Sequence, residues 1–225
     1  MILVVRLHET LGRGGWGLDH LGRPAGAGHE RSDAARNRRA VLEAARALFE
    51  ERGVTCVTME GIARAAGVGK GTLYRRFPNK GLLCEALLDE PTREFQRWTM
   101  ELVGEPGAGP LRKLDRFLDG LVRFTEENLD LLYGGEEPLW GATRLARFRS
   151  PAYDWRRWTV LGLLRAAARE GEVDESLDFD YLATALLAPL EVDLYYHQRR
   201  VAGLPLERIS AGLRSLVPGR QERDA

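Results

Sequence analysis

The sequence is poor in the residues that build metal sites and disulfide frameworks. Its 225 residues include two cysteines, Cys56 and Cys84, and four histidines. Two cysteines cannot form a disulfide framework, and these two are not spaced as a metal-binding pair. We expect two small buried thiols, with a redox-sensing pair as the alternative. Because the histidines are widely spaced, we expect neither a metal site nor a cofactor.

Long apolar runs and enzyme motifs are also missing. No run approaches the roughly 18 apolar residues of a membrane helix, and the opening MILVVRLHET is too short and lacks the cleavage site of a signal peptide. We therefore expect a cytoplasmic protein with no membrane partner. The HExxH and GxSxG patterns are absent, and HETLG at residue 8 lacks the second histidine. These absences argue against an enzyme, and we expect no catalytic residues.

The stretch AAGVGKGTLYRRF, residues 65–77, could suggest a phosphate-binding loop. Such a loop needs a glycine, four residues, Gly-Lys and then Ser or Thr, and it follows a buried strand. Here Gly71 follows Lys70, Arg64 stands at the position of the first glycine, and the preceding MEGIARAA is helix-like. The stretch is therefore interpreted as the start of a helix and not as a phosphate-binding loop.

The formal net charge of zero hides an uneven distribution along the chain. Residues 31–80 carry eleven basic and five acidic groups, whereas residues 81–225 carry nineteen basic and twenty-five acidic groups. A basic module joined to an acidic one is typical of a nucleic-acid-binding unit attached to a part that does not bind nucleic acid. Charged residues also simply solvate a surface, so this pattern is weak by itself.

The N-terminal part of the chain divides into an extension and a compact helical unit. Residues 1–31 hold seven glycines and no sustained periodicity, so we expect a disordered extension, with a DNA-contacting arm as the alternative. From Ser32 the apolar positions predict a helix of about 20 residues that stops at Gly53. Thr58 is the expected N-cap of the next helix, and Asn79 caps a longer one that begins at Lys80.

Between these lie two short helices separated by a glycine-containing turn, which is the pattern of a helix-turn-helix. The second helix, from about Gly69 to Phe77 and ended by Pro78, would lie in the major groove. Lys70, Thr72 and Arg75 are expected to project outward, and Leu73 and Phe77 to face the core. We assign residues 32–78 to a DNA-binding domain.

These residues resemble the TetR family of bacterial transcriptional regulators. The resemblance rests on ALFEERG, residues 47–53, followed by VTMEGIARAAGVGKGTLYRRFPNKGLL, residues 57–83, and it is continuous over residues 33–90. It implies that several residues contact DNA bases or phosphates: Thr58, Lys70, Gly71, Thr72, Tyr74, Arg75 and Lys80. Thr58 is a helix cap in any case, and the alternative for Tyr74 is packing in the core. Arg75 is the expected guanine contact.

The sequence departs from the family pattern at three positions. Gly69 stands where serine is frequent, Arg76 where histidine is common, and Gly81 where an acidic residue is common. Glycine remains a tolerated N-cap residue, so the fold is expected to be intact. The operator sequence, however, does not transfer by analogy.

The remaining chain, residues 79–217, is predicted to be helical throughout, with a flexible tail at 218–225. One helix is expected over PLRKLDRFLDGLVRFTEENLDLL, residues 110–132. Further helices are expected at about 137–148, 152–170, 178–202 and 205–216, which together with the four before them gives nine helices in an all-α fold. Pro189 should kink the helix over 178–202. The resemblance implies the same architecture: three helices that read DNA and a larger domain that binds an effector and dimerises.

Two leucine-rich stripes are the candidate homodimer interface, with ordinary core packing as the alternative. They comprise Leu182, Leu186, Leu190 and Leu194 in one helix and Leu206, Ile209 and Leu213 in the next. A dimer would let two recognition helices enter successive major grooves of a palindromic operator. His197 is expected to be a structural histidine, although it could also anchor a ligand or lie in the dimer interface.

A region dense in aromatic residues precedes these stripes. The resemblance implies a small-molecule pocket there, and the alternative is a solid core. The chosen lining residues are Trp98, Phe124, Trp140 and Trp158. The interpretation is a ligand-responsive regulator of transcription, by default a repressor, which a lipophilic or aromatic effector releases from double-stranded DNA. The alternatives are an all-helical dimeric small-molecule-binding protein and an enzyme, neither of which would bind DNA.

Overall fold

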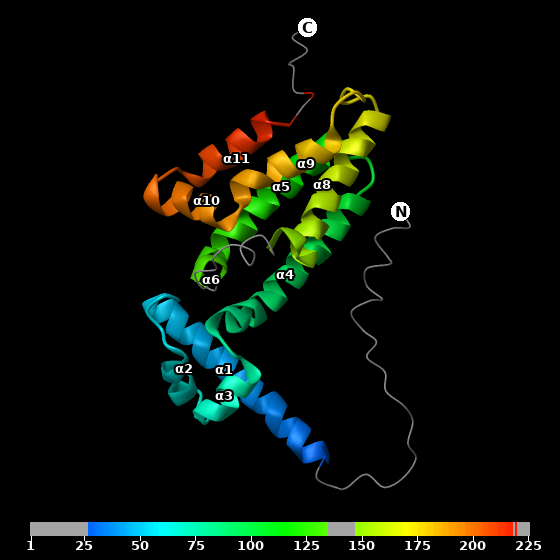
Figure 1. The fold of residues 1–225 in the computed structure, drawn as a ribbon. Helices are drawn as coiled ribbons and strands as arrows, with labels where there is room; N and C mark the ends of the chain where they lie inside the picture. The colour runs from blue at the N-terminus through cyan, green and yellow to red at the C-terminus, as the bar shows by residue number, and fades with distance from the viewer. Residues whose placement is uncertain (1–26, 135–146, 218, 220–225) are drawn as a thin grey trace, which may run out of the picture. The chain divides into compact units, whose positions relative to one another are not determined.

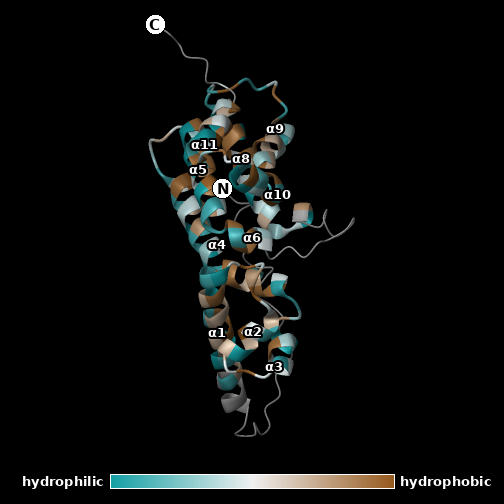
Figure 2. Cartoon of the chain, turned by 90° about the vertical axis from the view of Figure 1, so that its left-hand side faces the viewer, coloured by the Kyte–Doolittle hydropathy of each residue, from teal (hydrophilic) through white to brown (hydrophobic). Residues whose placement is uncertain are grey.

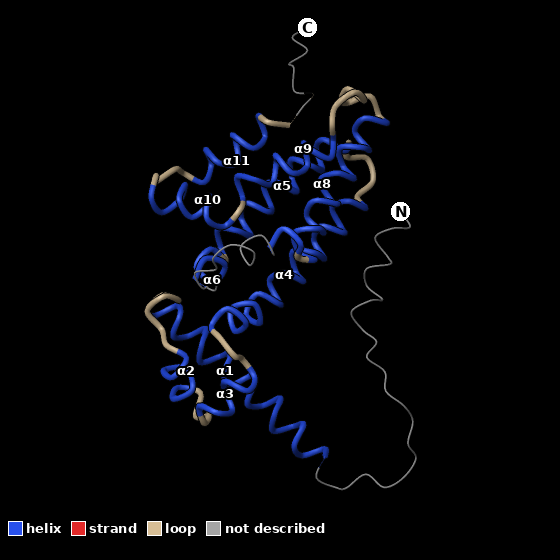
Figure 3. Tube along the Cα trace, viewed as in Figure 1, coloured by secondary structure: helices blue, strands red, loops and turns tan. Residues whose placement is uncertain are grey.

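The computed structural model describes residues 27–134, 147–217 and 219. These residues contain ten α-helices (Figure 1), and no strand occurs among them (Figure 3). The all-α prediction is confirmed. The predicted number of nine helices was too low, because the predicted helix over 110–132 is divided into two at Asn128 and the segment 178–202 is divided into several elements.

Four helices form the N-terminal part of the described chain. Their bounds are Ala27–Arg52 for α1, Met59–Ala65 for α2, Lys70–Arg76 for α3 and Lys80–Gly104 for α4. Helix α1 begins five residues before the predicted start at Ser32, and the rest of the predicted extension lies outside the described residues. Gly53 ends α1 with a positive φ of 76°, as a C-terminal glycine does.

One apolar core joins these helices. It is built from one face of α1, the inner residues of α2 and α3, and the first turns of α4, and its buried members include Val41, Ala45, Phe49, Ile62, Leu73, Phe77, Leu83 and Leu87. Side chains three and four residues apart share a helix face, which explains why Val41, Ala45 and Phe49 are buried together. This packing holds the two short helices, which are too short to be stable alone.

The second part of the chain has its own core. Its helices are α5 (Pro110–Glu127), α6 (Leu129–Gly134), α8 (Pro151–Arg169), α9 (Phe179–Leu187), α10 (Val192–Tyr196) and α11 (Leu206–Ser215). Helix α5 carries a continuous apolar face that includes Leu114, Phe117, Leu118 and Leu121, all of which are fully buried. Helices α4, α8 and α11 pack against α5 (Figure 2). Most of the predicted helix at 137–148 lies outside the described residues.

The segment predicted as one kinked helix over 178–202 is interrupted more strongly than expected. Helix α9 ends at Leu187, a 3-10 turn runs from Ala188 to Leu190, and α10 follows after Glu191. Pro189 lies in the 3-10 turn, where its missing N–H cannot continue the helix. The five residues after α10, His197–Val201, form a π-helical turn. Proline therefore breaks this helix rather than bending it.

Helix α4 belongs to both cores. Leu83, Cys84 and Leu87 in its first half are buried in the first core, and Leu102 near its end is buried in the second. Pro91 lies inside the helix between these two groups. Since proline has no N–H, the hydrogen bond that residue 91 would donate to the carbonyl of Leu87 is missing.

Candidate nucleic-acid interface and effector region

Helices α2 and α3 are positioned by local capping. Thr58 caps α2, since its Oγ1 accepts a hydrogen bond from the N–H of Gly61 at 3.1 Å. Gly67 has a φ of 66° and makes the turn that separates the helices. Gly69 is the N-cap of α3 and offers no side-chain bond, and Asn79 caps α4 through the N–H of Leu82 at 2.9 Å. The predicted caps at Thr58 and Asn79 are confirmed.

Helix α3 buries one face and leaves the other to solvent. Leu73 is fully buried and Phe77 is 5% exposed, as predicted from their spacing. Lys70, Gly71 and Arg75 are exposed, and Thr72 is half-buried. The outer face of α3 therefore carries cations and a residue without a side chain, with no carboxylate of its own.

Tyr74 belongs to the outer face. Its side chain is 43% exposed, so the alternative that its ring fills the core is wrong. A partly exposed tyrosine presents a hydroxyl that can donate to a phosphate while its ring rests on the protein.

Lys80 has a different position from the one expected for a phosphate clamp. Its Nζ donates to the carbonyl oxygens of Val54 at 2.9 Å and Thr55 at 3.5 Å. These carbonyls follow the end of α1, so the ammonium ties the start of α4 to the loop between α1 and α2. Sequence reasoning could not find this contact, because the partners lie about 26 residues away along the chain.

Sequence reasoning also missed an ion pair between the two short helices. The Nζ of Lys70, the first residue of α3, bonds Oε1 of Glu60 in the first turn of α2. The hydrogen bond from Lys70, followed by its charge, lowers the pKa of the Glu60 carboxyl. Glu60 is the one acidic residue between Thr58 and Lys80 in the sequence, which is the signal that could have drawn attention to it.

Comparison with known proteins shows which family this part of the chain resembles. Residues 41–87 match the model of the bacterial regulatory proteins of the tetR family. Over these residues, the chain is similar to the tetR family. The matched range holds the end of α1, both short helices and the first turns of α4.

Similar proteins extend the likeness beyond this TetR-family domain. An HTH-type transcriptional regulator of Staphylococcus aureus (strain bovine RF122 / ET3-1) is 32% identical over 123 residues, which are 55% of this chain and 64% of that protein. The alignment thus spans less than two thirds of the relative.

Solved structures share the fold. A TetR/AcrR-family regulator from Thermobifida fusca is 19% identical with a TM-score of 0.59, over 80% of this chain and 94% of its own. NalD of Pseudomonas aeruginosa, the secondary repressor of the MexAB-OprM multidrug efflux pump, is 24% identical with a TM-score of 0.59, over 84% and 99%.

The aromatic residues of the second core form a cluster centred on Phe95 of α4. Its ring stacks on Trp98 at 5.6 Å and on Phe124 at 5.1 Å between centroids, and it meets Trp155 edge-on at 5.8 Å. Gly120 of α5 makes room for this arrangement, since a Cβ there would lie 2.4 Å from the Trp98 ring. The rings of this cluster pack against one another.

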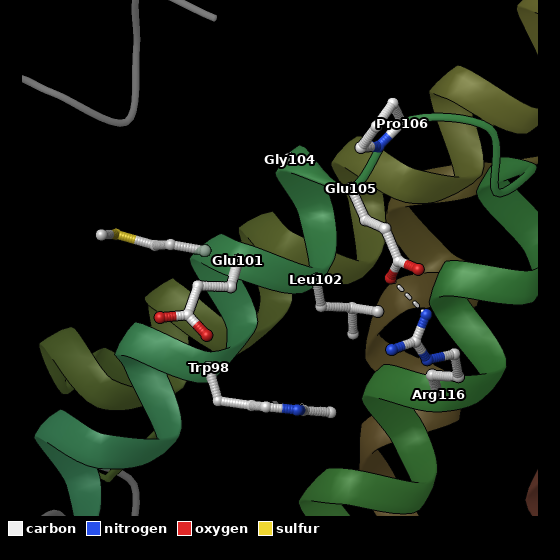
Figure 4. A pocket seen from close by; sticks show the side chains of 8 residues that line it. Trp98, Glu101, Leu102, Gly104, Glu105, Pro106 and Arg116 are labelled. Carbon is white, nitrogen blue, oxygen red and sulfur yellow. Dashed lines mark hydrogen bonds and ion pairs between the residues drawn. The ribbon is translucent and has the colours of Figure 1, made fainter.

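Two grooves open beside this cluster. One, of about 430 Å³, is lined by Pro91, Glu94, Phe95, Trp98, Gly120, Arg123, Phe124, Glu127 and Asn128. The other, of about 560 Å³, lies past Trp98 near the end of α4, where Glu105 pairs with Arg116 of α5 (Figure 4). Trp98 lines both grooves and Phe124 lines the first, so the structure brings these two expected effector contacts together.

The other two expected effector contacts are not part of this arrangement. Trp158 of α8 is 48% exposed, lines neither groove, and has the guanidinium of Arg157 at 5.4 Å from its ring centroid. Trp140 lies outside the described residues.

The leucine stripes lie largely within the core of the single chain. Leu186, Leu190, Ile209 and Leu213 are all at most 5% exposed. A side chain buried in its own subunit has almost no surface to give to a partner. Leu194 is 45% exposed, and Leu182 and Leu206 are half-buried, so these three are the members of the stripes that can reach a second chain.

The remaining predicted features differ in exposure. Cys84 is buried, and burial raises the pKa of its thiol to about 11. Cys56 is exposed, so the expectation of two buried thiols is wrong for this residue. His197 is exposed at the start of the π-helical turn. No described helix is both long enough and apolar enough to span a membrane.

Proposed function

We propose that the chain is a transcriptional regulator that binds double-stranded DNA through α3. The observation that carries this proposal is the division of α3 into a buried face, Leu73 and Phe77, and an exposed face with Lys70 and Arg75. A guanidinium matches the O6 and N7 atoms of guanine, and a lysine neutralises a phosphate or contacts a base. The family match over the same residues supports the proposal.

We infer that the operator is palindromic and that the protein acts as a homodimer in the bacterial cytoplasm, where such an operator lies. Two copies of α3 must be about 34 Å apart to enter successive major grooves. The exposed Leu194 and the half-buried Leu182 and Leu206 are our candidates for the subunit contact. Repression is the mode we propose, as for NalD, the solved repressor with the same fold.

An effector would act through α4. This helix supplies buried residues to both cores and contributes Phe95 and Trp98 to the aromatic cluster. A lipophilic or aromatic compound that binds beside Trp98 and Phe124 would change the tilt of α4, and with it the separation of the two recognition helices. Effector and operator then weaken each other's binding, because each favours a different arrangement of the dimer.

The experiment that tests DNA binding is fluorescence anisotropy with labelled duplexes. The probes are a duplex of about 30 base pairs enriched from a randomised library by the wild-type protein, and an unselected duplex of the same length. Affinity should fall linearly on a log-log plot as salt rises, because phosphate contacts release counterions.

The key variant in this assay is Arg75→Ala. It should weaken binding to the enriched duplex by about 1–3 kcal/mol. Arg112→Ala, which removes an exposed arginine of α5, outside the four N-terminal helices, should leave affinity unchanged. A library that yields no enriched duplex, together with no binding at low salt, would contradict the proposed function.

A further inference from the structure

The ion pair between Glu60 and Lys70 places a carboxylate on the surface proposed to meet a polyanion. Both side chains are more than half exposed, so neither charge is needed to stabilise a buried region. From Thr58 to Lys80, with both ends included, the chain carries five basic residues and this single acidic one. Its position therefore opposes the general attraction of this surface for DNA.

The pair links α2 to the first residue of α3. Glu60 is the second residue of α2, and the Thr58 cap fixes the start of this helix, so the backbone that carries the carboxylate is held in place. Lys70 follows the Gly69 N-cap, which makes no side-chain bond of its own. The carboxylate thus holds the ammonium next to α2. The positive charge of Arg64 also lowers the pKa of Glu60, to a smaller extent than Lys70 does.

We propose that Glu60 is a specificity-determining residue that restrains Lys70 and so lowers affinity for unselected DNA more than for the operator. This inference rests on the proposed DNA-binding function. A duplex that offers only phosphates must compete with Glu60 for the Lys70 ammonium. A duplex that also provides base contacts for Arg75 is held in register, and its binding depends less on this one cation.

The discriminating variant is Glu60→Gln, which keeps the size of the side chain and removes its charge. We expect affinity for the unselected duplex to rise about three- to tenfold near physiological salt, and the salt dependence to steepen by about one phosphate contact, a slope change of about 0.9. Affinity for the duplex enriched by the wild-type protein should change less than twofold. Glu43→Gln on α1 is the matched control, because it removes an exposed carboxylate that lies outside α2 and α3.

A second background separates restraint of Lys70 from plain repulsion of phosphates. In a Lys70→Met protein, Glu60→Gln should change affinity for the unselected duplex by less than twofold, since no ammonium is left to release. Thermal unfolding of each variant establishes that the domain is folded.

Three outcomes would overturn the inference while leaving the proposed function intact. They are an unchanged affinity for unselected DNA in Glu60→Gln, an equal gain for both duplexes, and the same gain with and without Lys70. Failure of the wild-type protein to bind either duplex instead overturns the proposed function, and the inference falls with it.

Discussion

Replacing Gly71 by alanine separates the stability of the recognition helix from its contact with DNA. Gly71 is the second residue of α3, it has no positive φ, and a Cβ built on it meets no atom within 4 Å. Alanine is favoured over glycine in a helix by roughly 0.5–1 kcal/mol. We therefore expect the melting temperature to rise by about 1–4 °C, given roughly 2–4 °C per kcal/mol for a chain of this size.

The same methyl group should weaken DNA binding. Gly71 is exposed and lies next to Lys70 in α3, and we expect the backbone to approach the duplex there. In that arrangement, DNA fills the free space around Gly71, and a methyl group there would collide with the duplex. A loss of at least about tenfold in affinity, or about 1.4 kcal/mol, is expected for the enriched duplex.

Differential scanning calorimetry and fluorescence anisotropy measure the two effects on the same sample. Gly162→Ala in α8 is the matched control, because Gly162 is exposed and also has no atom within 4 Å of a built Cβ. It should raise the melting temperature and leave DNA affinity unchanged. A Gly71→Ala protein that binds the enriched duplex as tightly as the wild type would refute the reasoning that DNA approaches the backbone here.

Three further predictions concern the rest of the molecule. Gly120→Ala forces a methyl group against the Trp98 ring and should lower the free energy of unfolding by about 1–3 kcal/mol, measured by urea denaturation. The hydrogen bond from Arg199 lowers the pKa of the Glu126 carboxyl. The stabilisation from this pair is therefore complete above the ordinary carboxyl pKa and is lost as pH falls through the lower folded value. Glu126→Gln should abolish this loss in urea titrations in which the pH is lowered from about 5. A thiol reagent at neutral pH should label one cysteine per native chain and two in denaturant, because Cys84 is buried with a raised pKa.

Each of these predictions has a control and a contrary outcome. Gly104→Ala, at a site where a Cβ meets nothing, should not reduce stability; equal effects at both glycines would contradict the packing argument. Glu127→Gln, at an exposed neighbouring position, should leave the loss of stability at low pH unchanged. A Glu126→Gln protein that loses as much stability at low pH as the wild type would contradict the role of the pair with Arg199. Labelling of Cys84 at the rate seen in denaturant would contradict its burial.

Features that depend on neighbours along the chain could be predicted from the sequence. The caps at Thr58 and Asn79 and the stop at Gly53 follow from residue chemistry at helix ends. The burial of Leu73 and Phe77 follows from their spacing of four. The DNA-reading unit is built almost entirely from such local signals, which is why its helices and its outer face could be predicted.

Features that depend on distant partners could not. Lys80 donates to a carbonyl 26 residues away, and the periodicity of apolar residues does not predict which acceptor a long, flexible lysine side chain reaches. Leu186 and Leu190 share a stripe with Leu194, yet the break at Pro189 turns the later residue outward, so one stripe divides between core and surface. A helical pattern identifies an apolar face but does not tell whether that face meets its own chain or a second copy.

Pro91, in the middle of α4, determines which movements this helix can transmit from one end to the other. An uninterrupted helix is stiff in both bending and torsion, and it would turn at one end when turned at the other. With the hydrogen bond to Leu87 missing at Pro91, bending is the soft deformation, and the two halves can hinge about this point. Phe95 lies one turn after Pro91, so a compound bound beside its ring would contact the helix close to this bending point.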